Sequence, residues 1–349
     1  MTGSVERVRT LISGGVPDRP PLFDLLRNDA VLGRFAGEKL SLENSERVVF
    51  SAYEPAIDAT RPSVRLPHRE ETIVLEDGRT QRHFRWTAWT DHITYGCPED
   101  WLSAKRKILD VDPSHWDEGS EARMLQYLNS ISDHRSRLGE VFFVPGGSCV
   151  GLMSIINETG LEQFVYYNAD YPDVIDAILE HQTVAAEAFV SHIPDGHDID
   201  AVFAGDDIAF NTGPFLSPSW FEEHYFERLS RVIEAYHAKG IKVLFHSDGN
   251  LNSVLNGLVA AGIDGLNPIE VLAGMDIRDI HRRYPHLFMA GGIDVSQLLP
   301  FGTPGQVRDA VNRAIDDAEG RIMIGSSTEL NDEVPLENFL AMRETVLTR

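Results

Sequence analysis

The stretch Ile241-Lys242-Val243-Leu244-Phe245-His246-Ser247-Asp248 decides the fold. A short run of apolar and β-branched residues ends there in a polar cluster. A segment of helical period, Leu251–Ala261, comes next, and Gly262 then stops that helix before another short apolar run, Gly265–Asn267. A strand, a helix and a second strand in this order predict a βαβ unit with parallel strands.

The same alternation continues on both sides of this unit. Ser217-Pro218 and Thr303-Pro304 each supply an N-cap residue followed by proline in the first helical turn. Apolar runs predict parallel strands near residues 22, 58, 142, 201, 243, 266, 288 and 323. Eight such units predict an α/β fold, a (β/α)₈ TIM barrel, with extra N-terminal helices and residues 1–349 in a single domain.

One segment departs from the parallel pattern. Thr72–Trp89 alternates apolar and polar residues around an Asp77-Gly78 turn, which predicts a β-hairpin inserted into the barrel at about residues 70–95. A doubly wound open sheet is the alternative architecture. It is disfavoured because no G-x-G-x-x-G motif follows the first strand.

Composition narrows the class of protein. The 349 residues carry 31 Lys plus Arg and 54 Asp plus Glu, a net charge of −23, and 42% are hydrophobic. That is enough apolar material for a core, which excludes disorder. The acidity makes nucleic acid and anionic membranes unexpected partners. Two cysteines cannot build a disulfide framework, and no signal-like or membrane-length apolar run occurs, so a cytoplasmic protein is expected.

Polar residues follow the predicted strands, where a barrel places its active site. Helix capping and turn formation are the alternative explanation for each one taken singly. The candidates are Asp24, Arg27, Asp58, Arg61, Asp206, Asp207, His246, Asp248, Glu270, Asp294 and Ser326.

The strongest pattern is the His-x-Asp pair. His246 and Asp248 are two residues apart, so an extended backbone points both side chains the same way. With Asp206 or Asp207 from the neighbouring strand they could hold a divalent metal, with zinc the first choice and Mn²⁺ or Mg²⁺ also compatible. Alternatively, His246 forms an acid–base pair or a structural clamp with an aspartate. We predict His246, Asp248 and Asp206 as metal ligands.

The remaining candidates receive roles in catalysis or substrate binding. We predict His246, Asp207 and Asp58 as catalytic residues. The predicted substrate-binding residues are Asp24, Arg27, Arg61, Glu270, Asp294 and Ser326.

Several motifs, taken in order, resemble the uroporphyrinogen decarboxylase superfamily. They cover most of residues 200–340. The motifs are Gly205-Asp206-Asp207-Ile208, Gly213-Pro214, Phe245-His246-Ser247-Asp248-Gly249-Asn250, Ala261-Gly262-Ile263-Asp264-Gly265-Leu266-Asn267-Pro268, Gly291-Gly292-Ile293-Asp294, Leu298-Leu299-Pro300-Phe301-Gly302-Thr303-Pro304 and Asp332-Glu333-Val334-Pro335-Leu336-Glu337-Asn338. The resemblance implies a (β/α)₈ barrel and one of two chemistries.

Neither chemistry has its full signature here. The decarboxylases hold substrate carboxylates with an N-terminal arginine pair, of which only Arg27 has a counterpart, and they have a C-terminal histidine where this chain has Ser326. The corrinoid-linked methyltransferases bind zinc through H-x-C and a later cysteine. In this chain Asp248 and Ser326 or Ser327 stand in those two cysteine positions.

Electrostatics favours the second chemistry, because an acid-rich mouth would repel a porphyrinogen with eight carboxylates. The resemblance therefore implies a methyltransferase-like enzyme acting on a small molecule with a separate corrinoid protein. A uroporphyrinogen or other carboxylate decarboxylase of tetrapyrrole biosynthesis is the alternative, and a non-catalytic binding barrel is the second. A homodimer is a candidate assembly.

Overall fold

The computed structural model describes residues 2–349 and contains a ring of parallel strands. Five strands pair in the order β12-β11-β10-β9-β6, and β1 pairs with β5. Their bounds are β1 Ala59–Thr60, β5 Phe142–Phe143, β6 Ala201–Ala204, β9 Lys242–His246, β10 Gly265–Asn267, β11 Phe288–Ile293 and β12 Ile322–Ser326.

Single parallel bridges complete the ring. Leu22 pairs with Ile324 of β12, Phe23 pairs with Ala59 of β1, and Gly146, just after β5, pairs with Phe203 of β6. The segment around Leu22 and Phe23 therefore occupies the first of the eight strand positions of the barrel, although it is too short to form a regular strand. The predicted TIM barrel is confirmed.

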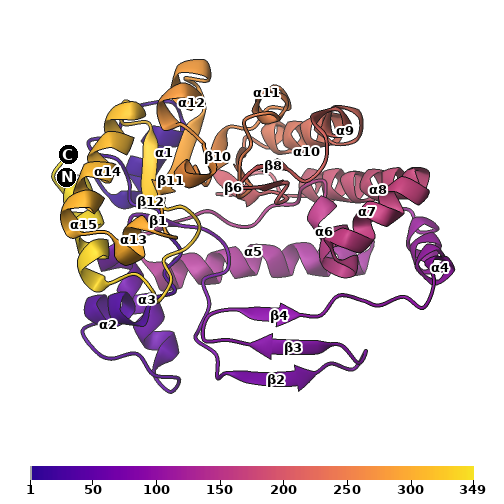
Figure 1. The fold of residues 1–349 in the computed structure, drawn as a ribbon, viewed down its shortest axis with the longest axis horizontal. Helices are drawn as coiled ribbons and strands as arrows, with labels where there is room; N and C mark the ends of the chain where they lie inside the picture. Colours follow the sequence, from indigo (N-terminus) through magenta and orange to yellow (C-terminus); the bar gives the residue numbers. More distant parts are fainter. Residues whose placement is uncertain (1) are drawn as a thin grey trace.

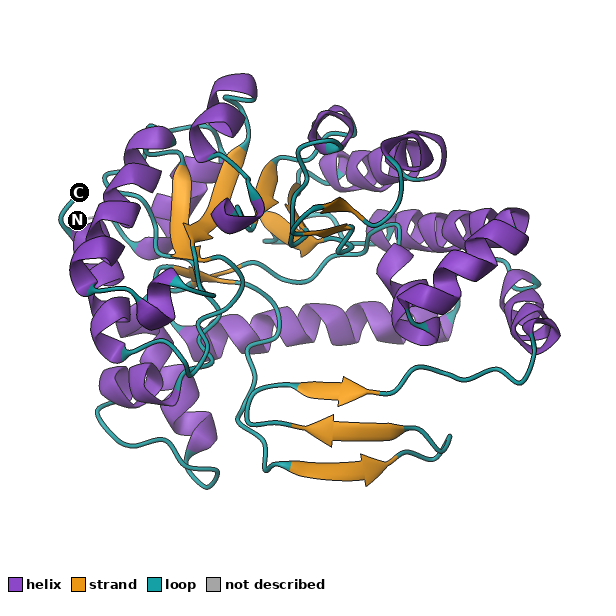
Figure 2. Ribbon diagram, viewed as in Figure 1, coloured by secondary structure: helices purple, strands orange, loops and turns teal. Residues whose placement is uncertain are grey.

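Helices surround this ring (Figures 1 and 2). The extra N-terminal helices, which the sequence predicts, are α1 Ser4–Ile12, α2 Asp29–Ala36 and α3 Ser45–Ala56. The others are α4 Pro98–Leu109, α5 Glu118–Leu138, α6 Leu152–Thr159, α7 Leu161–Asp170, α8 Pro172–Ser191, α9 Pro218–His224, α10 Phe226–Ala238, α11 Leu255–Ala260, α12 Ile277–Arg283, α13 Leu298–Phe301, α14 Pro304–Asp317 and α15 Leu336–Leu347, with a 3₁₀ turn at Val271–Ala273.

Local sequence explains where two of these helices begin. The Ser217 side chain accepts a hydrogen bond from the Trp220 amide at the start of α9, and Thr303 forms a capping box with Gln306 at the start of α14. The helical segment that begins at Pro218 is divided into α9 and α10 at Tyr225, a buried residue whose hydroxyl donates to Asp206.

The inserted segment forms more than a hairpin. β2 (Glu71–Val74), β3 (Thr80–His83) and β4 (Ala88–Thr90) make a three-stranded antiparallel sheet, drawn below α5 in Figure 1. The second turn is closed by the Phe84 amide donating to the Thr87 carbonyl, a turn without glycine that the sequence analysis did not identify. A separate short pair joins β7 Ala209–Phe210 to β8 Gly213–Pro214.

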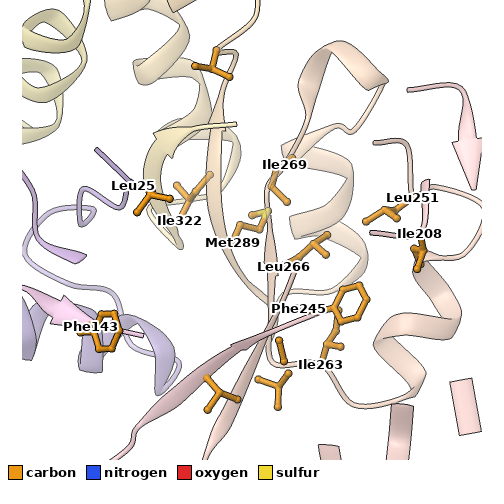
Figure 3. Close-up of a cluster of buried hydrophobic side chains, with 14 of the residues drawn as sticks. Leu25, Phe143, Ile208, Phe245, Leu251, Ile263, Leu266, Ile269, Met289 and Ile322 are labelled. Carbon is orange, nitrogen blue, oxygen red and sulfur yellow. The ribbon is translucent and has the colours of Figure 1, made fainter. Parts of the chain in front are cut away.

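Buried apolar side chains fill the space between strands and helices. Figure 3 shows part of this core, including Phe245 of β9, Leu266 of β10, Met289 of β11 and Ile322 of β12. Each of these four side chains is at most 1% exposed. Dense packing holds the carboxyl ends of the strands rigidly, and the polar residues discussed next project from those ends.

Candidate active site

His246 ends β9, and its ring is fixed by a neighbouring strand. Its Nδ1 lies 2.9 Å from Oδ1 of Asn267, the last residue of β10. The Asn267 amide nitrogen donates to the Ala290 carbonyl at 3.1 Å, so the amide oxygen faces the imidazole and must accept from Nδ1–H. Burial lowers the pKa of His246, despite the nearby Asp207 carboxylate. The neutral ring therefore presents an unprotonated Nε2.

Two carboxylates share this space with His246. Asp207 Oδ1 lies 3.6 Å from His246 Nε2 and accepts a hydrogen bond of 3.0 Å from the Asp248 amide. One ligand atom each from Asp207, His246 and Asp248 lies within 4.8 Å of the others. Of the predicted residues, the structure brings these three together.

The Asp248 carboxylate lacks a partner for one oxygen. Oδ1 is buried without a hydrogen bond in the described part of the chain. Burial, together with the negative charges of Asp207 and Glu270, raises the pKa of Asp248 to about 7. A cation would relieve this uncompensated charge, and two carboxylates with one imidazole form a donor set that suits a divalent metal with an open position. The residues therefore fit the predicted metal.

A tight turn holds Asp248 in place. Gly249 has φ +92°, and a Cβ there would lie 2.7 Å from the Ala209 and Phe210 carbonyl oxygens, so only glycine fits. Its amide donates to Glu270 Oε2 at 2.6 Å. Glu270 thus anchors the turn, and burial raises its pKa.

A second part of the barrel mouth is cationic. Two arginines form ion pairs with Glu329. Its Oε2 lies 2.6 Å from Arg27 Nη1 and 3.7 Å from Arg61 Nη2. Both Nε atoms are buried without partners within residues 2–349. Arg61 lies over the Phe203 ring at 5.1 Å, and the same ring packs against His246 with centroids 4.8 Å apart. Phe203 therefore separates the cationic part from the metal-ligand cluster.

Asp24 and Ser326 form a buried pair that connects the first and last strands. The Ser326 hydroxyl and amide donate to the Asp24 carboxylate at 2.7 and 3.0 Å. Burial raises the pKa of Asp24 to about 6 in spite of these bonds. The Asp24 and Ser326 side chains therefore hydrogen-bond to each other inside the barrel.

Asp206 lies away from the cluster, although it was predicted as a metal ligand. Its carboxylate is 2% exposed and accepts hydrogen bonds from Gly151 N, Met153 N and Tyr225 Oη at 3.0, 2.8 and 2.9 Å. The Asp206 carboxylate therefore holds the start of α6. Asp207, and not Asp206, lies with His246 and Asp248.

Asp58, which the sequence predicts as a catalytic residue, lies outside the barrel mouth. The strand begins at Ala59, so Asp58 precedes β1 and lies at the opposite end of the barrel from His246. Its carboxylate binds Arg7 at 2.9 Å and Arg19 at 2.7 Å. Burial opposes ionisation, but hydrogen bonds led by Arg19 lower the pKa of Asp58 below its usual value. A catalytic role at the mouth is incompatible with this position.

Asp294 caps a helix. Its oxygens accept from the amides of Ser296, Gln297 and Leu298 at the start of α13, and these bonds lower its pKa against the effect of burial. This is the capping explanation that the sequence analysis left open.

Three residues at the mouth were missed. Asn267, Phe203 and Glu329 carry no reactive signature of their own. Asn267 lies in a quoted motif at a strand end, which was the available signal, whereas the roles of Phe203 and Glu329 depend on contacts between distant segments.

The chain is an eight-stranded parallel barrel with a cluster of ionisable side chains at the carboxyl ends of neighbouring strands. The family model described as uroporphyrinogen decarboxylase (URO-D) matches residues 116–348, well over half of the chain. The chain belongs to the uroporphyrinogen decarboxylase family.

A solved structure supports the fold. A methyltransferase from Methanosarcina mazei is 17% identical, with a TM-score of 0.67 over 100% of this chain and 99% of that one. A B12-independent methionine synthase from Shewanella sp. W3-18-1, in complex with selenomethionine, is 11% identical with a TM-score of 0.48, over 95% of this chain and 98% of that one. No curated protein sequence matches the chain. No helix within residues 2–349 combines the length and hydrophobicity that a membrane crossing requires.

Proposed function

We propose that this protein is a methyltransferase-like enzyme whose reaction centre consists of Asp207, His246 and Asp248. The observation that carries the proposal is the position of the His246 ring, whose Nδ1 is held by Asn267 and which offers one ligand atom within 4.8 Å of an oxygen from each of two carboxylates. The family membership and the methyltransferase of the same fold support an enzyme of this kind.

The residues suggest how methyl transfer would be assisted. A methyl acceptor becomes a better nucleophile when it loses its proton, and His246 Nε2 is placed to accept that proton. Asp207, 3.6 Å away, would stabilise the resulting imidazolium. Asp248, with a pKa of about 7, exchanges a proton easily near neutral pH.

A divalent metal, with zinc the first choice, would be held by His246, Asp207 and Asp248. When bound, it would supply a Lewis acid that lowers the pKa of the acceptor group. In that case the role of Asn267 is to orient His246 as a ligand. A small-molecule substrate and a separate corrinoid protein as methyl carrier complete the proposal, and a homodimer remains a candidate assembly.

Metal binding tests the metal form of the proposal. The native chain and His246→Ala are equilibrated with zinc, freed of excess and analysed for metal, with the exposed His286→Ala as the matched control. We expect about one zinc per chain in the native protein and in the control, and at least tenfold weaker binding in His246→Ala. Absence of stoichiometric metal from the native chain would refute this form.

Activity tests the reaction class itself. Methyl transfer from free methylcob(III)alamin to small-molecule acceptors that carry an ionisable proton is followed by visible absorption. We expect His246→Ala and Asp207→Asn to lose at least about a hundredfold in rate. Turnover unaffected by both substitutions would place the reaction elsewhere.

A second function is favoured by Arg27 and Arg61. Two buried guanidinium groups close to Glu329 could bind a substrate carboxylate in its place, which suits decarboxylation of a carboxylic acid. Release of CO₂ from uroporphyrinogen or a smaller acid, lost in Arg61→Gln, would support this function over methyl transfer.

A further inference from the structure

A cavity lies outside the barrel mouth, between the start of α5, the loop after β5 and α8. Its volume is about 440 Å³, within the usual range for small-ligand sites. It shares no lining residue with the Asp207, His246 and Asp248 cluster, and the inference below does not depend on the proposed function. The side chains that matter are His115, Trp116, Arg123, Ser148, Ala185 and Phe189.

The charge of this cleft is opposite to that of the chain as a whole. The chain has a net charge of −23, yet no Asp or Glu lines the cleft. Arg123 forms no ion pair within residues 2–349, and its guanidinium donates only to the Ser120 hydroxyl, at 2.7 Å. Asp117, close in sequence, is engaged at the start of α5, where it accepts from the Ser120 amide at 2.8 Å. Hydrogen bonds from Ser120, and then the charges of His115 and Arg123, lower the pKa of Asp117, so this carboxylate lies near Arg123 without an ion pair between them. The Arg123 guanidinium keeps free donors for a ligand.

The walls of the cleft are flat and apolar. The Trp116 indole stacks on His192, with centroids 3.7 Å apart and planes 4° apart, which fixes the ring as a rigid wall. Phe189 lies 6.5 Å from the same indole. Ala185 leaves space between them and the polar end. Because the Phe189 and Trp116 planes meet at 52°, the two rings form one continuous wall, and an aromatic ligand would bury one face against it.

Donors gather at the polar end. Besides Arg123, the Ser148 hydroxyl and the His115 ring line the cleft, and neither side chain has a hydrogen bond in the described part of the chain. A carboxylate accepts from several donors and forms its strongest hydrogen bonds with a guanidinium. We propose that the cleft is a binding site for a small aromatic carboxylate, with its acid group on Arg123 and its ring against the wall that Trp116 and Phe189 form.

Calorimetric titration of the full chain tests this site, with 2-naphthoate as the probe and 2-naphthamide as its uncharged analogue. Arg123→Gln removes the charge, and Arg34→Gln, an exposed arginine on α2 far from the cleft (Figure 1), is the matched control. We expect naphthoate to bind about tenfold more weakly to Arg123→Gln than to the native chain or the control. The amide should bind both variants equally.

Ala185→Phe gives an independent check, because it fills the cleft while leaving Arg123 in place. We expect this variant to lose naphthoate binding and to keep its thermal transition. The proposal is overturned if the native chain shows no saturable binding of naphthoate, or if Arg123→Gln or Ala185→Phe binds it as tightly as the native chain.

Discussion

Asn267 sets the chemistry of His246 without being reactive itself. Its amide oxygen accepts from Nδ1–H, and its amide nitrogen is held by the Ala290 carbonyl, so the orientation of both groups is determined. The proton is thereby kept away from Nε2, the nitrogen that faces Asp207. The arrangement of a reactive histidine supported by a fixed acceptor is common at metal and acid–base centres.

Replacing Asn267 by alanine tests this role at the scale of one residue. We expect zinc affinity to fall about tenfold, because the ring loses both its orientation and its tautomeric preference. Competition with a chromophoric chelator measures the change. Asn312→Ala, on α14, serves as the control, and equal affinities in the two variants would contradict the positioning role.

Asp24 makes stability depend on pH. Its folded pKa of about 6 is higher than the usual 3.8, so the folded state binds the proton more tightly than the unfolded state does. The stabilisation is complete below the unfolded pKa and is lost as pH rises through the folded value. The Asp24→Asn variant has no titratable group at this position, so its free energy of unfolding lacks this pH-dependent contribution.

Urea unfolding of both proteins at pH 5.5 and pH 8 measures the effect. We expect the free energy of unfolding of the native chain, relative to Asp24→Asn, to decrease by about 1 kcal/mol between the two pH values. A relative stability that increases with pH would show that the folded pKa is lowered instead.

At the scale of elements, the close contact of the first and last strands depends on glycine. A Cβ on Gly325 of β12 would lie 1.7 Å from the Phe23 carbonyl oxygen, and the backbone there cannot yield without opening the ring. Phe23 is also half of the bridge to Ala59.

Gly325→Ala should therefore destabilise the fold by about 4 kcal/mol or more. Chemical denaturation measures this change, with Gly305→Ala on α14 as the control, where the nearest atom to an added Cβ is 3.8 Å away. If Gly325→Ala is as stable as the native chain, β12 and the Phe23 segment are not in the close backbone contact described above.

Elements also show how far the sequence alone could lead. The strands of the C-terminal half have strong apolar runs with clear helix signals between them, so β9, β10 and β12 could be predicted. Asp58 was misassigned because β1 has only two residues, and a shift of one position moves a polar residue from one end of the barrel to the other. Asp294 was ambiguous because a helix cap and a ligand use the same side chain. Contacts such as Arg27 with Glu329, 302 residues apart, leave no local pattern.

At the scale of the whole molecule, the two ends of the barrel use aspartate differently. At the mouth, Asp207 and Asp248 carry charge that lacks full compensation. At the opposite end, Asp58 is neutralised by Arg7 and Arg19 and ties α1 to the barrel. We infer that the first end serves function and the second stability.

Asp58→Ala separates these roles. Removal of the shared partner from a buried ion-pair cluster should lower the free energy of unfolding by about 3 kcal/mol, because Arg19 loses its carboxylate and the buried Arg7 keeps only the half-exposed Asp18. Zinc affinity of the folded variant should equal that of the native chain. A folded Asp58→Ala with weakened zinc binding would argue that both ends belong to one site.

An anomalous scattering scan of zinc-equilibrated crystals tests the proposal that Asp207, His246 and Asp248 form the reaction centre and hold a metal. We expect one strong peak at about 2.0–2.2 Å from His246 Nε2 and from oxygens of Asp207 and Asp248. A barrel mouth without a peak, or a peak on other residues, would contradict the account.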